Sequence, residues 1–235
     1  MVVRQTSGRG ERDLKVRVKS AKNRPVGSTR WLERQLNDPY VKRARREGWR
    51  SRAAYKLMEI DDKYRILRPG MVVLDLGCKP GGWCQVASLR VNALEEQQSN
   101  SRGRVIGIDL ETTEPIAGAD LHVMDFLDED AVEQIHSILG TAPHVILSDM
   151  AAPMIGHKQT DQLRTLLLAE ATFSLACEIL AANGSMVAKV MSGGASPDLQ
   201  NRLKQAFQKV HNVKPPASRA GSSERYVVAQ GFRLR

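Results

Sequence analysis

Residues 71–83 read MVVLDLGCKPGGW, and this stretch decides the fold class. It is an apolar, β-branched run that ends in an acidic residue and passes into a glycine-rich turn. The same form returns as VIGID at residues 105–109 and as HVILS at residues 144–148, which comes directly before Asp149. Short apolar runs of this kind are typical of strands that are buried on both faces of a sheet.

Further apolar runs at residues 185–190 and 226–232 indicate two more strands. Helices are expected between the strands, at residues 82–94, 131–139, 162–182 and 198–210. Strands that alternate with helices form a mostly parallel sheet with helices on both faces. The sequence therefore predicts an α/β, Rossmann-like, doubly wound fold, with the polar residues 95–104 as a surface loop.

The excess positive charge lies in the first fifth of the chain. The whole chain carries 35 Lys and Arg against 26 Asp and Glu, and residues 1–50 hold 15 of the basic but only 5 of the acidic residues. Dense basic segments bind polyanions because each neutralised phosphate releases condensed counterions. We expect residues 1–50 to form a basic, helical or disordered arm that binds RNA, with short helices near 31–36 and 40–47. The alternative is a solvated tail without a partner.

Other classes of protein fit the composition poorly. No apolar run approaches the length of a membrane span, and the N-terminus lacks the apolar core of a secretory signal. An organelle transit peptide is an alternative, but acidic residues interrupt the basic start. Cys78, Cys84 and Cys177 form no CxxC pair, so neither a disulfide framework, a zinc site nor any other metal site is expected. We expect a soluble, cytoplasmic protein.

The turn after the first strand distinguishes two kinds of cofactor. A dinucleotide site needs the spacing G-x-G-x-x-G, but here the glycines are Gly77, Gly81 and Gly82, and Pro80 removes an amide donor. A ligand without phosphate fits this turn better, and S-adenosylmethionine has none. Asp109, at the end of the next strand, stands where an acid can accept both hydroxyls of an adenosine ribose. The sequence therefore favours S-adenosylmethionine over a nicotinamide dinucleotide.

Five ordered segments carry a resemblance to a known family. They are SRAAYKL at residues 51–57, the glycine-rich turn, SDMA at 148–151, AKV at 188–190 and SERY at 223–226. In these segments the chain resembles the FtsJ family of RNA methyltransferases, from about Gly27 to the C-terminus. The resemblance implies a methyltransferase domain over residues 51–235, whose first helix is expected at residues 51–67. It also implies methylation of a ribose 2′-hydroxyl, of a uridine in large-subunit (23S) ribosomal RNA. We expect the RNA to be part of the ribosomal subunit and the enzyme to be a monomer.

The resemblance also implies the site residues. The catalytic tetrad of the family falls on Lys56, Asp149, Lys189 and Glu224. The cofactor contacts fall on Gly81, Trp83, Asp109, Asp125 and Asp149, with Asp125 facing the adenine amino group.

Methyl transfer to a hydroxyl explains why such residues would be needed. A general base must be unprotonated, whereas free lysine has a pKa of about 10.4. Burial and the neighbouring cation Lys56 would favour the neutral amine of Lys189 as the base, whereas Asp149 acts in the opposite direction and would orient the amine and the donor. Glu224 would position Lys56 or the ribose.

Three positions depart from the family pattern. Cys78-Lys79 replaces small residues, and Lys79 either points to solvent (the interpretation we prefer), pairs with the methionyl carboxylate or weakens binding. Ala152-Pro153 shifts the proline that often follows the tetrad aspartate, and residues 191–194 (MSGG) replace an aromatic-led sequence.

Three other functions remain as alternatives. One is a transfer-RNA 2′-O-methyltransferase of the same family, and another is a non-catalytic RNA-binding or ribosome-assembly factor. The third is a nicotinamide-dependent oxidoreductase, which the glycine spacing disfavours.

Overall fold

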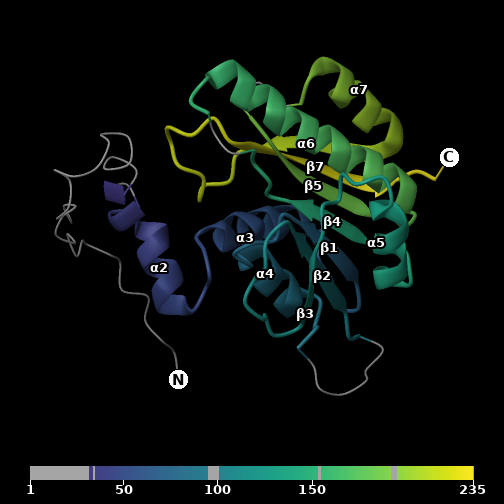
Figure 1. Cartoon of the computed structure of the whole chain (residues 1–235), viewed down its shortest axis with the longest axis horizontal. Coiled ribbons are helices and arrows are strands. Elements are labelled where there is room, and N and C mark those ends of the chain that lie inside the picture. Colours follow the sequence, from purple (N-terminus) through teal and green to yellow (C-terminus); the bar gives the residue numbers. More distant parts are fainter. Residues whose placement is uncertain (1–31, 34, 95–100, 153–154, 192–194, 235) are drawn as a thin grey trace.

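A seven-stranded sheet forms the centre of this computed structural model, in the order β3-β2-β1-β4-β5-β7-β6 (Figure 1). The structure describes residues 32–33, 35–94, 101–152, 155–191 and 195–234. The strands are β1 (Val72–Leu76), β2 (Arg104–Asp109), β3 (Ala119–Val123), β4 (Val145–Ser148), β5 (Ser185–Val190), β6 (Phe207–Val213) and β7 (Arg225–Phe232). Strands β1 to β5 pair in parallel, whereas β7 pairs antiparallel with both β5 and β6.

Strand order reverses between β1 and β4. From β1 the chain winds outward through β2 to β3, and it then returns to β4 on the other side of β1. In open sheets of this type, ligands bind beyond the carboxyl ends of the strands at such a reversal. This edge of the sheet is therefore where the functional site is expected.

Helices cover both faces of the sheet (Figure 1). They are α2 (Pro39–Glu47), α3 (Ala53–Tyr64), α4 (Gly82–Arg90), α5 (Ala131–Leu139), α6 (Lys158–Ile179) and α7 (Pro197–Ala206). Helices α3 and α4 pack on one face with Val73, and α5, α6 and α7 pack on the other with Leu74 and Leu76. All of β1 is buried, which is why its sequence is continuously apolar up to Asp75. None of the helices in the described residues is long and apolar enough to cross a membrane.

Helix α2 packs on α3 beside the main body of the fold. Its buried Ala44 lies in a small apolar cluster with Tyr55 and Ala217, and the rings of Tyr40 and Tyr55 are 5.4 Å apart. Asp38 caps the N-terminus of α2 by accepting a hydrogen bond from the Tyr40 amide at 3.0 Å. The part of the basic segment that the structure describes is thus helical and attached to the domain.

The predicted α/β, doubly wound class is confirmed, and the differences are local. The expected helix over residues 198–210 is wrong beyond Ala206, because β6 begins at Phe207 and pairs with β7. Strand β3 was not predicted, since its half-exposed sequence ADLHV lacks the apolar run of the central strands. The predicted helix at residues 40–47 is confirmed as α2. Residues 1–31, and residues 95–100 of the expected loop, lie outside the described residues.

Candidate active site

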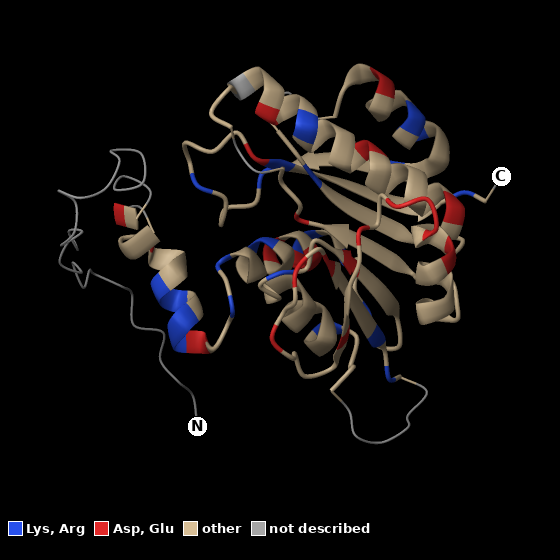
Figure 2. Cartoon of the chain, in the orientation of Figure 1, with Lys and Arg blue, Asp and Glu red and all other residues tan. Residues whose placement is uncertain are grey.

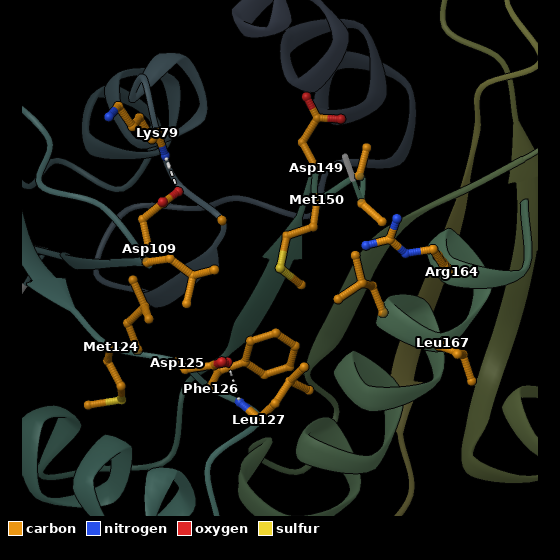
Figure 3. Close-up of a pocket in the computed structure, with 16 residues that line it drawn as sticks. Lys79, Asp109, Met124, Asp125, Phe126, Leu127, Asp149, Met150, Arg164 and Leu167 are labelled. Atoms are coloured by element: carbon orange, nitrogen blue, oxygen red, sulfur yellow. Dashed lines mark hydrogen bonds between the residues drawn. The ribbon is translucent and has the colours of Figure 1, made fainter. Parts of the chain in front are cut away.

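A pocket of about 720 Å³ opens at the reversal of strand order (Figure 3). Its walls come from the segments that follow β1, β2, β3 and β4 and from α6. The lining residues are Gly77, Lys79, Ile108, Asp109, Leu110, Met124, Asp125, Phe126, Leu127, Asp149, Met150, Ala151, Ala152, Arg164, Leu167 and Leu168. Three of the five residues expected to contact the cofactor, Asp109, Asp125 and Asp149, therefore lie in one cavity.

Asp109 and Asp125 are held by backbone amides at the rim of this pocket. The carboxylate of Asp109 accepts hydrogen bonds from the amides of Lys79 at 2.9 Å and Glu111 at 3.1 Å, and that of Asp125 accepts one from Leu127 at 3.0 Å. In Figure 3, Asp109 lies to the left and Asp125 below it, with the Met150 side chain to the right of both. Fixed carboxylates at two strand ends can accept hydrogen bonds from hydroxyls and from an amino group.

The glycine-rich turn lies so close to the Met150 side chain, just after β4, that a side chain at one of its glycines would force a neighbour to shift. Gly77 has φ of +69°, and a Cβ placed there would lie 2.2 Å from Cγ of Met150. The turn and the segment after β4 are therefore in direct contact, and the floor of the pocket depends on both.

Neither Trp83 nor Gly81 lines the large pocket. Trp83 lies deeper in the fold, and Gly81 lies beyond the lining of both cavities. Trp83 is buried at a second cavity of about 50 Å³, which shares Gly77, Lys79 and Asp149 with the large pocket, and its indole N–H donates to the Ala53 carbonyl at 2.8 Å. Gly81 lines neither cavity. It caps the N-terminus of α4 with φ of +106°, where a Cβ would meet Ile116.

A buried hydroxyl at the small cavity has room for a ligand. The Oγ of Ser51 is buried and makes no hydrogen bond within the described part of the chain. An unpartnered buried hydroxyl costs free energy unless a ligand or water meets it. The two cavities together thus offer carboxylates at one end and a hydroxyl at the other, which suits a nucleoside joined to a polar amino-acid tail.

Lys79 lies at the rim and points to solvent, as preferred from the sequence. Its side chain is exposed, and its ammonium pairs with the carboxylate of Glu111. Pro153 and residues 192–194 of the other two unusual segments lie outside the described residues.

The four residues of the expected tetrad meet at one end of the large pocket, although they come from α3, β4–α6, β5 and the segment before β7. The Nζ of Lys56 lies 2.9 Å from both carboxylate oxygens of Glu224 and 3.7 Å from Oδ2 of Asp149. The Nζ of Lys189 lies 2.8 Å from Oδ1 of Asp149, 2.6 Å from its backbone carbonyl and 3.7 Å from Glu224. Two ammonium groups and two carboxylates thus form one closely paired cluster.

Burial and pairing act against each other in this cluster, and pairing prevails. Burial acts to raise the pKa of Asp149, but the ammonium groups of Lys189 and Lys56 hold that pKa below its ordinary value. Burial likewise acts to raise the pKa of Glu224, and the same two cations lower it. Burial acts to lower the pKa of Lys189, but Asp149 and Glu224 raise it above its ordinary value.

The protonation state expected for Lys189 is therefore corrected. Burial lowers the pKa of Lys189 as expected, but the carboxylates of Asp149 and Glu224 outweigh burial and raise that pKa. In the absence of ligands Lys189 is an ammonium ion, so a proton must leave it before it can accept another.

A match to a known family agrees with this arrangement. The model of the FtsJ-like methyltransferases matches residues 49–232. The chain belongs to this family. Two full-length relatives are each named Ribosomal RNA large subunit methyltransferase E. The protein from Ruegeria pomeroyi is 60% identical over 99% of this chain and 100% of its own length. The protein from Jannaschia sp. (strain CCS1) is 59% identical over 100% of this chain and 99% of its own length.

One solved structure agrees with the assignment to the FtsJ-like methyltransferases, and a second shares the fold. A protein from Plasmodium falciparum, provisionally described as a ribosomal RNA methyltransferase, superposes with a TM-score of 0.69 at 32% identity. The match covers 80% of this chain and 100% of that one. A protein from Streptococcus thermophilus described as a hemolysin has a TM-score of 0.54 at 14% identity, and this similarity extends to the fold alone. The predicted methyltransferase class is confirmed.

Sequence reasoning missed one member of the cluster in this FtsJ-like methyltransferase. The hydroxyl of Tyr226 donates to Oδ1 of Asp149 at 2.5 Å and accepts from Lys56 at 3.1 Å. Burial raises the pKa of Tyr226 well above its ordinary value, and Asp149 and Glu224 add to this effect. Tyr226 is the last residue of the SERY segment, two positions after Glu224, so its place in that segment could have indicated it.

Proposed function

We propose that this chain transfers a methyl group from S-adenosylmethionine to a ribose 2′-hydroxyl of large-subunit ribosomal RNA, at a uridine. The observation that carries the proposal is the position of the paired cluster. Asp149 belongs both to the cluster and to the lining of the pocket that holds Asp109 and Asp125. A donor in the pocket and an acceptor at the cluster would therefore be brought together, which lowers the barrier by proximity.

The residues present fit S-adenosylmethionine. Asp109 would accept hydrogen bonds from the ribose hydroxyls and Asp125 from the adenine amino group, while the cavity beside Ser51 and Trp83 would hold the methionyl part. Gly81 would act indirectly, by starting α4 at the turn. When bound, the cofactor supplies a methyl group on a positively charged sulfonium, and that charge opposes protonation of a neighbouring amine.

In the proposed mechanism the four cluster residues have different roles. Lys189 would first release its own proton to water and would then take the proton of the 2′-hydroxyl as the ribose oxygen bonds to the methyl group and the bond from that group to sulfur breaks. Asp149 orients the Lys189 amine, and it also accepts a hydrogen bond from the Tyr226 hydroxyl. Lys56 keeps a positive charge beside the reacting oxygen and is held by Glu224.

The substrate is proposed from the relatives and from the charge. The relatives from Ruegeria and Jannaschia are named for the RNA of the large ribosomal subunit. Arg45 and Arg46 of α2 are exposed, and Figure 2 shows basic residues on this helix beside the domain. Residues 1–50 would therefore be the RNA-binding arm and residues 51–235 the methyltransferase domain. The family match over residues 49–232 supports this boundary.

The oligomeric state and the location of the enzyme are proposed from the same cluster and relatives. One chain supplies all four residues of the cluster, so a monomer suffices. We infer that it works in the cytoplasm on RNA within the ribosomal subunit. Transfer RNA is the alternative substrate within the family.

Alkaline hydrolysis of labelled RNA tests the reaction. The protein is incubated with methyl-labelled S-adenosylmethionine and large ribosomal subunits from cells that lack it. Alkali cleaves RNA through attack by the 2′-hydroxyl on the adjacent phosphate, so a methylated ribose leaves a resistant dinucleotide. We expect the label in that dinucleotide.

The outcomes separate the parts of the proposal. Label only in mononucleotides would mean base methylation and would contradict the ribose assignment. Label in transfer RNA, offered in the same assay, with none in the subunit would overturn the substrate but not the chemistry. No label in either would favour a non-catalytic RNA-binding factor.

A further inference from the structure

Glu224 lies in a segment that no strand holds. It stands between the end of β6 at Val213 and the start of β7 at Arg225, and this segment extends from the sheet toward α3 (Figure 1). Holding a glutamate side chain in one rotamer costs conformational entropy. A carboxylate in a connecting segment therefore keeps one orientation only if contacts of its own offset that cost. Its partners therefore decide how it meets Lys56.

One such partner is the hydroxyl of Ser218. It donates a hydrogen bond to Oε1 of Glu224 at 2.9 Å, on the carboxylate that also receives Lys56. Ser218 is only 7% exposed, so water competes little for this hydrogen bond. Its amide donates to the Pro215 carbonyl at 2.9 Å, which closes a turn.

Helix α3 holds this turn on both sides of Ala217. The Ala217 amide donates to Oε2 of Glu59 at 2.7 Å, and the Ala217 carbonyl accepts from the Arg52 guanidinium. Arg52, Lys56 and Glu59 are spaced at i, i+4 and i+7, so they share one face of the helix. The helix that carries Lys56 thus also fixes the turn that carries Ser218.

A buried carboxylate closes the turn on its other side. Asp38, which caps α2, accepts from the Arg52 guanidinium and from Nε of Arg219 at 3.0 Å. The chain from Asp38 through Arg52 and Ala217 to Ser218 is continuous. It connects the start of α2 to the catalytic cluster.

We propose that Ser218 is a positioning residue that holds the Glu224 carboxylate toward Lys56, and this inference rests on the proposed function of the cluster. Ser218 touches neither amine of the tetrad in the described contacts and acts through Glu224. Losing its hydroxyl would leave the carboxylate free to rotate, and Lys56 would lose its fixed partner.

The test measures steady-state methyl transfer to large ribosomal subunits from cells that lack the protein. We expect Ser218→Ala to lower kcat about tenfold, the scale of a hydrogen bond to a charged group, with the KM for S-adenosylmethionine within about twofold of wild type. Ser218→Thr, which keeps a hydroxyl, should restore most of the rate. Ser223→Ala is the matched control, since its hydroxyl makes no hydrogen bond among the described residues of the same segment.

A double-mutant cycle separates positioning from general stability. If Ser218 acts through Glu224, Ser218→Ala should cause no further loss of kcat in a Glu224→Ala background. Additive losses, or an unchanged kcat in Ser218→Ala alone, would overturn the inference. If Glu224→Ala itself kept the wild-type kcat, the proposed role of Glu224 in the cluster would fail first. Equal thermal unfolding midpoints for wild type and Ser218→Ala would exclude misfolding as the cause.

Discussion

At the scale of single residues, the protonation of Lys189 decides whether the cluster can act. Asp149 and Glu224 outweigh burial and raise the pKa of Lys189. The neutral amine is therefore a minor species at neutral pH. As long as the pH stays below the pKa of Lys189, the neutral fraction grows about tenfold for each unit by which the pH rises.

This gives a direction for the pH dependence of catalysis. We expect kcat for methyl transfer to rise between pH 6.5 and 9, because the rate follows the neutral fraction of Lys189. Lys189→Arg keeps a cation between the carboxylates but cannot lose its proton, so it should lower kcat by at least about 100-fold and remove the rise. Lys56→Arg is the charge-preserving control and should keep the slope. A flat profile in wild type would remove Lys189 as the base.

Asp75 provides a second prediction, on stability. Complete burial raises its pKa from the ordinary 3.8 to about 7, although Cys84 donates a hydrogen bond to it at 3.1 Å. Between these two values the unfolded chain is ionised while the folded chain stays protonated, so stability falls as pH rises from about 4 to 7. Asp75→Asn removes this penalty.

The measurement is urea unfolding at pH 5 and pH 8. The stability of Asp75→Asn relative to wild type should increase by about 1–3 kcal/mol between pH 5 and pH 8. Glu129→Gln removes one charge at an exposed site and should produce little change. An equal difference at the two pH values would mean that Asp75 is ionised in the folded protein.

The sequence predicted which four residues form the cluster but not how they interact. Lys56 and Tyr226 stand 170 positions apart, and Lys56 and Glu224 stand 168 apart. No periodicity records contacts over such separations. The balance between burial and pairing at Lys189 also depends on distances that appear only in the folded chain. Ser218 was missed for the same reason, since its role requires the turn that α3 holds.

At the scale of elements, the turn between β1 and α4 shapes the pocket through close contact. Gly77→Ala would place a Cβ against the Met150 side chain in addition to straining a positive φ, so that side chain or the turn must shift at the wall of the pocket. We expect the affinity for S-adenosylmethionine to fall by roughly 1–3 kcal/mol in calorimetry. Gly140→Ala is the matched control, because Gly140 has a similar φ of +62° with no atom within 4 Å of its Cβ.

Both variants should lose some stability, but only Gly77→Ala should lose affinity. Equal affinities for the two variants would mean that the turn does not form the floor of the cofactor site. The comparison separates the strain that is common to both glycines from the contact that only Gly77 makes.

The elements themselves were predicted where their pattern is local. Buried strands such as β4 and β5 have continuous apolar sequences, and α5 was predicted with the correct bounds at Ala131–Leu139. The sequence predicts a helix through residue 210 because residues 207–213 (FQKVHNV) are mostly polar and lack the apolar run of the central strands. Its pairing with β7, from Phe207 opposite Phe232 onward, overrides that local pattern.

At the scale of the whole molecule, the charge is divided between a basic N-terminal segment and a nearly neutral remainder. Helix α2 joins the two, because its apolar side packs on Tyr55 while Arg45 and Arg46 are exposed. Figure 2 shows this basic helix beside the domain and away from α7. An RNA that reaches the cluster could contact α2 at the same time.

Removing the positive charge of α2 shows whether that charge binds the substrate. Replacing Arg45 and Arg46 together by Ala should weaken binding to ribosomal RNA. It should also reduce the steepness of log affinity against log salt concentration by about 1–2, because fewer phosphate contacts form on binding and fewer counterions are released. The affinity for S-adenosylmethionine should not change, because neither side chain lines the pocket. The matched control replaces Lys204 and Lys209, two exposed cations on α7 and β6, and removes the same charge from another part of the surface.

A purely general attraction between a basic protein and RNA would make the two double variants equivalent. A loss confined to the α2 variant, with a reduced salt slope, would assign the phosphate contacts to that helix. An unchanged slope in both would leave the described part of the basic segment without a role in RNA binding, and residues 1–31 would then be the segment to delete.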